Sequence, residues 1–189
     1  MNRFKMVYLL LVLLCSMCLW GNFADAKEIT IRAVTFQTLG PATKGFEWFL
    51  EQVNQRGKGI IQIKLVGGPE SIPGRDQPEA VRRGSIDLSL VPTSYYMNLV
   101  PAGHSLTFSP LTPAEERQSG YYDFLNKVHT EGGLHFVGRE NWGTLFNIWT
   151  NKAVKRPQDF KGQMLRVGKS PTKLVQYLGA EAVSIPISD

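Results

Sequence analysis

The sequence contains only two cysteines, and both lie within the first 20 of its 189 residues. The first 26 residues combine a basic start, an apolar stretch from about 7 to 20, and the small residues Ala24 and Ala26. That layout is typical of a secretory signal peptide that is cleaved after Ala26. A retained anchor is the alternative, but the apolar stretch is short of the roughly 20 residues that a membrane span needs.

Removal of the signal peptide leaves a chain without thiols, so its fold must rest on a hydrophobic core and not on disulfides. No second segment is long and apolar enough to suggest a membrane span. The 21 basic and 16 acidic residues give a net charge of +5 and are scattered along the chain. A nucleic-acid-binding protein would need a basic patch or stripe, so we expect no nucleic-acid partner.

Catalytic and metal-binding signatures are also missing. His104, His129 and His135 lack metal-ligand spacing, and we expect each on the surface or on a helix face. The sequence has no G-x-S-x-G nucleophile motif. "GQMLRVGKS" resembles a phosphate loop, but Gln163 stands where its first glycine is required. We therefore predict no metal, no cofactor and no enzymatic activity.

Hydrophobic periodicity predicts alternating strands and helices, which favours an α/β fold with mainly parallel strands. The predicted strands span 28–36, 60–68, 134–138, 143–150, 163–167 and 182–187. A further strand, the third along the chain, begins the stretch 85–96 and runs into an aromatic loop. The predicted helices span 41–59, 75–84, 111–133 and 170–179.

Individual residues predict where one of these helices begins and ends. Thr112, Pro113 and Glu115 match the N-cap, N1 and N3 positions of a capping box. Gly132 and Gly133 should end that helix. The glycine-rich stretch 67–80, between a strand and a helix, could hold an anion, but we favour a flexible turn.

Arg166 is the most unusual residue of the pattern. It lies near the end of a short apolar strand, just before a helix that begins at Ser170-Pro171. Ligands of open α/β sheets bind at the carboxyl ends of strands, and an arginine can bind a carboxylate through two parallel hydrogen bonds. Spacing alone favours the plainer alternatives, in which Arg166 pairs with an acidic residue or extends into solvent.

Three segments together resemble the solute-binding proteins of TRAP transporters, of the DctP-like family. They span 70–96, 111–128 and 151–189, and the third is the most specific. It contains K-G-x-x-x-R at 161–166, followed by L-G-A before the next strand. The resemblance covers the whole chain after about residue 28.

The resemblance implies a two-lobe periplasmic-binding-protein-like α/β fold with a ligand cleft between lobes that close by a hinge. It divides the chain into a signal peptide (1–26), a first lobe (27–140), and a crossover strand with a partial second lobe (141–189). Family members usually continue beyond this point, so we expect a truncated or fragmentary second lobe. The implied function is a periplasmic receptor that passes a small organic acid to TRAP permease subunits in the membrane.

The resemblance also implies a set of ligand-binding residues. In the family, the arginine at the position of Arg166 binds the ligand's carboxylate. Many members carry a second arginine where this chain has Asn147, so a monocarboxylate, hydroxy acid or keto acid is expected over a dicarboxylate. Further candidates are Phe36 and Trp142, together with Thr93 and Tyr95, which follow the third strand.

Two other functions stay open at this level. An exported α/β enzyme would need a nucleophile and a base, and the sequence shows no such pair. A receptor domain could instead report ligand to a sensor without transport.

Overall fold

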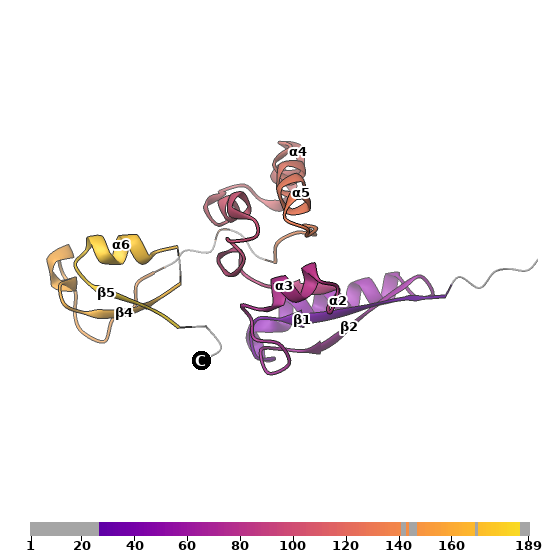
Figure 1. Ribbon diagram of the computed structural model, residues 1–189, viewed down its shortest axis with the longest axis horizontal. Helices are drawn as coiled ribbons and strands as arrows, with labels where there is room; N and C mark the ends of the chain where they lie inside the picture. Colours follow the sequence, from indigo (N-terminus) through magenta and orange to yellow (C-terminus); the bar gives the residue numbers. More distant parts are fainter. Residues whose placement is uncertain (1–26, 141–142, 144–146, 169, 186–189) are drawn as a thin grey trace, which may run out of the picture.

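The computed structural model describes residues 27–140, 143, 147–168 and 170–185. These residues form two parallel sheets, which lie at opposite ends of the view in Figure 1. We call the part up to residue 140 the first lobe and the part from 147 to 185 the second lobe. The predicted signal peptide and Trp142 fall outside the described residues.

The sheet of the first lobe has the strand order β2-β1-β3, and both pairings are parallel. Its strands are β1 (Ile29–Thr35), β2 (Ile61–Gly67) and β3 (Leu88–Leu90). Parallel neighbours need crossover connections, which here contain the 3-10 helix η1 (Pro41–Thr43) and the helices α2 (Lys44–Arg56) and α3 (Gln77–Arg82). The alternation predicted for residues 28–90 is confirmed.

Helix α2 covers one face of this sheet. Phe46 and Leu50, one helical turn apart, are buried against Ala33 of β1 and Ile63 of β2. Gly57 ends the helix, as predicted, and its N–H donates to the carbonyl of Val53. This contact forms the main apolar core of the first lobe.

A helical layer follows β3 and lies above the sheet in Figure 1. It contains η2 (Thr93–Tyr95), η3 (Pro101–Phe108), α4 (Pro113–Gln118) and α5 (Tyr121–Glu131). The capping box at Thr112 is confirmed, because its N–H donates to Glu115 over 2.7 Å and its hydroxyl accepts from the Glu115 N–H over 3.3 Å.

The prediction of one helix over 111–133 is wrong. Gly120 lies at φ 79°, a left-handed conformation that an α-helix cannot contain, so the chain forms two helices. The strand predicted at 134–138 is also wrong, since these residues join no sheet. Phe136 instead packs against Leu106 and Leu125.

The second lobe contains η4 (Pro157–Phe160), β4 (Met164–Val167), α6 (Thr172–Tyr177) and β5 (Glu181–Ser184). β4 and β5 pair in parallel, with Val167 opposite Ser184. Leu165 and Val167 pack beneath Val175 of α6. The C-cap of α6 is Leu178, and Gly179, which the sequence predicts as the C-cap, is the next residue, in the left-handed conformation at φ 81°.

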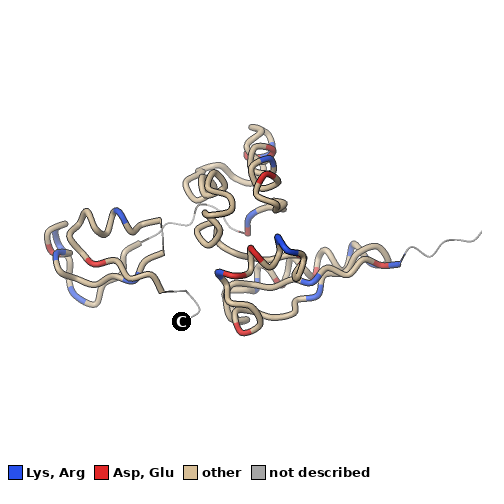
Figure 2. Tube along the Cα trace, viewed as in Figure 1, with Lys and Arg blue, Asp and Glu red and all other residues tan. Residues whose placement is uncertain are grey.

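The predicted strand at 143–150 lies partly outside the described residues. Its described part, residue 143 and 147–150, has no regular secondary structure. No helix within 27–140, 147–168 or 170–185 is long and apolar enough to cross a membrane. Figure 2 shows basic and acidic residues interspersed along the described trace, in agreement with the scattered charge of the sequence.

Candidate functional site

The carboxyl ends of β1 and β3 bring two predicted site residues together. Phe36 directly follows β1, and its N–H donates to the carbonyl of Leu90 at the end of β3. Tyr95 lies five residues beyond Leu90, in η2. The rings of Phe36 and Tyr95 meet edge to face, with centroids 5.9 Å apart. Parallel strands end at one edge of a sheet, which explains why residues nearly 60 positions apart are in contact.

The loop from β2 to α3 closes over this aromatic pair. A Cβ atom on Gly74 would lie 3.2 Å from both the Phe36 Cβ and the Tyr95 ring, so only glycine fits there without displacement. The next residue, Arg75, places its guanidinium carbon 5.7 Å from the centroid of the Tyr95 ring. That distance is within the range of a cation–π contact.

Arg75 was not among the predicted site residues. The only sequence signal is its position in a glycine-rich stretch after a strand, for which a flexible turn is the favoured interpretation. Residues 68–76 contain turns and no helix or strand, and the buried side chain of Gln77 anchors the stretch. The amide of Gln77 donates to the carbonyls of Thr35 over 2.8 Å and Ile72 over 2.9 Å.

Thr93 contributes to a second, more polar cluster. Its hydroxyl lies 2.9 Å from Nδ1 of His104 and 3.0 Å from the hydroxyl of Thr107. The other ring nitrogen of His104, Nε2, lies 2.6 Å from the hydroxyl of Ser170. Burial lowers the pKa of His104, which favours a neutral imidazole between two hydroxyl partners.

His104 and His129 are both buried and not on the surface. Both lie on helices, the other position that the sequence predicts, His104 in η3 and His129 in α5. The Nδ1–H of His129 donates to the carbonyl of Leu125 over 2.7 Å. Its Nε2 lies 3.1 Å from the hydroxyl of Tyr96. Desolvation is the main reason why the pKa of His129 is lowered.

Within the part of the chain that the structure describes, two hydrogen bonds connect the lobes. The first joins His104 to Ser170, which lies between β4 and α6. In the second, Arg75 Nη2 donates to the hydroxyl of Ser184, the last residue of β5, over 2.8 Å. In the second lobe, Ser170 follows β4 and Ser184 ends β5, and these two strands are parallel. The carboxyl ends of the two sheets therefore face each other, which is where ligands of open α/β sheets bind.

Arg166 lies on β4 but is not enclosed by the second lobe. Its side chain is exposed and points away from the face on which Leu165 and Val167 contact α6. Among the described residues, no carboxylate lies within ion-pair distance of Arg166, so the alternative of a structural salt bridge finds no support there. Asn147 is also exposed, in a segment without regular structure.

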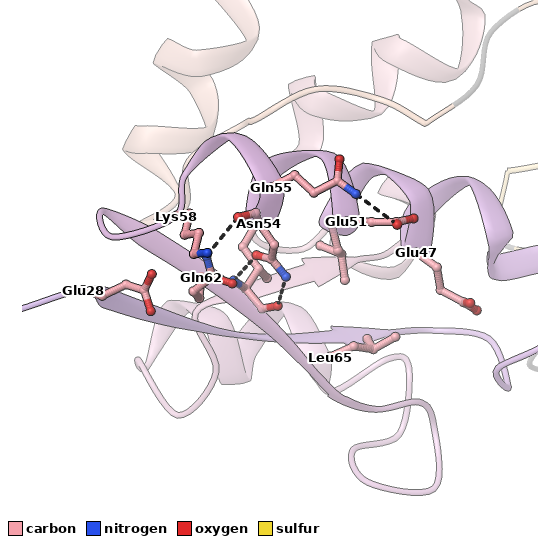
Figure 3. A pocket seen from close by; sticks show the side chains of 10 residues that line it. Glu28, Glu47, Glu51, Asn54, Gln55, Lys58, Gln62 and Leu65 are labelled. Carbon is pink, nitrogen blue, oxygen red and sulfur yellow. Dashed lines mark hydrogen bonds between the residues drawn. The ribbon is translucent and has the colours of Figure 1, made fainter.

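A separate open groove of about 740 Å³ lies between α2 and β2. Figure 3 shows Glu28, Glu47 and Glu51 around it, with Lys58 as the labelled cation. Three carboxylates make this groove unfavourable for an anion. Within it, the amide of Asn54 donates to the carbonyl of Ile63 over 2.9 Å and accepts from its N–H over 2.6 Å. Asn54 thus satisfies backbone groups at the free edge of β2.

The sequence matches the bacterial extracellular solute-binding protein family 7 (DctP) over residues 33–189. The chain belongs to this family. It is 26% identical over 152 residues to the 2,3-diketo-L-gulonate-binding periplasmic protein YiaO of Escherichia coli. That alignment covers 75% of this chain and 45% of YiaO.

Solved TRAP periplasmic solute-binding proteins share the fold. One from Pseudoalteromonas atlantica, with bound sodium and pyruvate, superposes with a TM-score of 0.68 at 17% identity, over 86% of this chain and 52% of that one. One from Fusobacterium nucleatum, with bound sn-glycerol-3-phosphate, gives 0.62 at 23% identity, over 85% and 55%. The predicted two-lobe α/β fold is confirmed, and the chain spans about half the length of these relatives.

In this member of the family, the segment that leaves the first lobe is anchored just before residue 141. Arg139 Nη2 lies 2.8 Å from a Glu116 carboxylate oxygen, and the two side chains are only 10% and 2% exposed. The contact meets the distance of an ion pair but not the angles of a hydrogen bond. Arg139 also donates to the carbonyl of Leu111, and the next residue, Glu140, accepts from the N–H of Phe46 in α2.

Proposed function

We propose that this protein is an extracytoplasmic receptor that binds a small organic-acid anion and delivers it to a TRAP-type permease. The observation that carries the proposal is the meeting of the two sheets at their carboxyl ends, through Arg75–Ser184 and His104–Ser170. The relatives support the ligand class, because diketogulonate, pyruvate and glycerol 3-phosphate are all small anions.

In this proposal, Arg166 binds the solute's carboxylate. A guanidinium offers two parallel donors to a carboxylate, and no described acidic residue competes for Arg166. Phe36 and Tyr95 contact the carbon skeleton, and Thr93 positions His104 at the lobe junction. Asn147 and Trp142 remain candidates from the sequence pattern, close to the crossing between lobes.

The remaining parts of the proposal follow from the sequence. The first 26 residues act as a cleaved signal peptide, which places the mature protein in the periplasm. Binding closes the lobes without chemical change to the solute, so the protein is a receptor and not an enzyme. A closed, loaded receptor is then the form that the permease recognises.

The test is calorimetric titration of the purified protein with pyruvate, 3-hydroxybutyrate, L-malate, glycerol 3-phosphate and glucuronate. At least one of these acids should bind, and Arg166→Gln should weaken it roughly 10- to 100-fold by removal of a charge-assisted hydrogen bond. Lys173→Gln, which removes one exposed cation from α6, is the matched control and should bind like the wild type.

Two results would count against the proposal. If none of the five acids binds to the wild-type protein, a receptor for small organic anions is the wrong function. If an acid binds equally well to the wild type and to a folded Arg166→Gln variant, the receptor function stands but Arg166 is not its carboxylate-binding residue.

A further inference from the structure

Arg75 is an uncompensated cation at the junction of the two lobes. Its side chain is exposed, and among the residues that the structure describes no carboxylate lies within ion-pair distance of it. Its guanidinium donates to the neutral hydroxyl of Ser184, 2.8 Å away. A guanidinium has five N–H donors and can bind an oxyanion through two parallel hydrogen bonds, so a single bond to a hydroxyl leaves much of its binding capacity unused.

The surroundings of Arg75 hold it in a defined position. The anchored amide of Gln77 fixes the loop on both sides of Arg75 by its bonds to Thr35 and Ile72. Close packing at Gly74 brings that loop against the aromatic pair, and the Tyr95 ring lies under the guanidinium. A preorganised cation loses little conformational entropy on binding, which is a property of ligand-binding residues.

The position of Arg75 relates it to Arg166. Ser184 pairs with Val167 in the β4–β5 sheet, and Val167 directly follows Arg166. The guanidinium of Arg75 therefore ends one residue along the register from Arg166, although it comes from the other lobe. Consecutive strand residues point to opposite faces, so the two cations lie on the two faces of the β4–β5 sheet, at its carboxyl end. One solute molecule between the sheets could contact both cations.

We infer that Arg75 is a second anion-binding residue of the solute site, and that the preferred solute carries two anionic groups. This inference rests on the proposed receptor function. Arg166 binds one group from the second lobe, and Arg75 binds the other, a carboxylate or a phosphate, from the first. This inference replaces the expectation of a singly charged solute. That expectation rested only on Asn147, which stands where many family members have a second arginine.

The test compares matched acids on the purified protein by calorimetric titration. L-Malate and 3-hydroxybutyrate share four carbons and a hydroxyl but carry two carboxylates and one. Glycerol 3-phosphate, with one phosphate group, and glucuronate, with one carboxylate, extend the comparison to other acids that have a single anionic group. The wild type should prefer the acid with two anionic groups, and Arg75→Gln should weaken its binding roughly 10- to 100-fold while it changes the binding of acids with one anionic group less than threefold.

Two variants separate ligand binding from a purely structural role. Ser184→Ala removes the contact between the lobes but keeps the cation, and it should retain the preference for two anionic groups. Arg75→Lys keeps the positive charge but lacks the two parallel donors of a guanidinium. It should lose only part of the preference for two anionic groups. Thermal melts of each variant without ligand check that the fold is intact.

Each other outcome overturns the inference. If Ser184→Ala weakens all acids as much as Arg75→Gln does, Arg75 acts as a contact between the lobes and not as an anion-binding residue. If the wild type binds singly charged acids as well as doubly charged ones, the inferred solute class is wrong, while the receptor function stands. If no acid in the panel binds, the proposed function and this inference fail together.

Discussion

The two lobes are built from different kinds of buried groups. Among the described residues, every buried polar or charged side chain lies in the first lobe: Thr35, Thr43, Gln77, Thr93, His104, Glu116 and His129. The described core of the second lobe is apolar and consists of Leu165, Val167, Val175 and Ala180.

The two lobes therefore illustrate two ways in which buried side chains stabilise a fold. Apolar burial is non-directional, so a small apolar core tolerates rearrangement. Buried polar groups must each find a partner, which restricts the first lobe to one arrangement. The groups that position Arg75 and His104 belong to this polar set. The first lobe should therefore respond strongly to single polar substitutions and to pH, and the second lobe should respond mainly to loss of apolar volume.

The largest effect should follow Arg139→Met, which leaves the carboxylate of Glu116 buried without its cation. Loss of one partner from a buried pair costs about 3–5 kcal/mol of stability. Urea denaturation followed by tryptophan fluorescence would measure the change.

The control is the double variant Glu116→Gln with Arg139→Met, which removes both charges together. It should recover a large part of the lost stability, because no uncompensated charge remains. Equal losses in the single and double variants would show that Arg139 stabilises the first lobe by packing, which would weaken the contrast between the lobes.

Most of the fold follows from periodicity and from breaker residues. The strands at 29–35, 61–67 and 164–167 and helix α2 lie where the apolar pattern predicts them. The errors have local causes. The apolar spacing of Tyr121, Phe124 and Leu125 was extended back through Gly120, whose positive φ divides the helix. The run at 134–138 buries Phe136 against helices and pairs with no strand, a choice that periodicity alone does not show.

The site was predictable only in part. Phe36 and Tyr95 follow strand ends, and the rule that parallel strands end together was enough to place them side by side. The binding roles of these two residues, and those of Thr93, Asn147, Trp142 and Arg166, stay predictions. Arg75 could not be found because its contacts are with Tyr95 and with Ser184, 109 positions away. Nothing in a glycine-rich turn indicates a partner in the other lobe.

A smaller effect should come from acid pH. Burial lowers the pKa values of His104 and His129 below the ordinary 6.5 in the folded protein. The unfolded chain then binds more protons than the folded one once the pH falls below about 6.5, so stability is full above that value and declines below it. Melting temperatures should fall accordingly as the pH is lowered from 7.5 to 5, a range in which Glu79, whose pKa is lowered to about 2 mainly by its hydrogen bond with Arg82, does not titrate.

Two variants connect this pH response with the lobes. His129→Gln should flatten the pH dependence of the first lobe, where His129 contacts Tyr96 and Leu125. His104→Gln should also weaken the contact with Ser170 of the second lobe. A melting temperature that stays constant from pH 7.5 to 5 in the wild type would mean that neither imidazole is held neutral by burial.

The smallest effect should come from helix capping, which differs among the helices. Helix α4 has the reciprocal capping box of Thr112 and Glu115, whereas α2, α3 and α5 of the first lobe and α6 of the second have no side-chain cap at their N-cap residues. Thr112→Ala should cost about 1 kcal/mol, because the N–H of Glu115 loses its acceptor. Thr130→Ala, at an exposed position of α5, changes the same atoms without removing a cap and should stay within about 0.5 kcal/mol of the wild type. If both variants lose the same stability, the capping box contributes nothing specific. The single arrangement of the first lobe then depends on its buried polar groups alone.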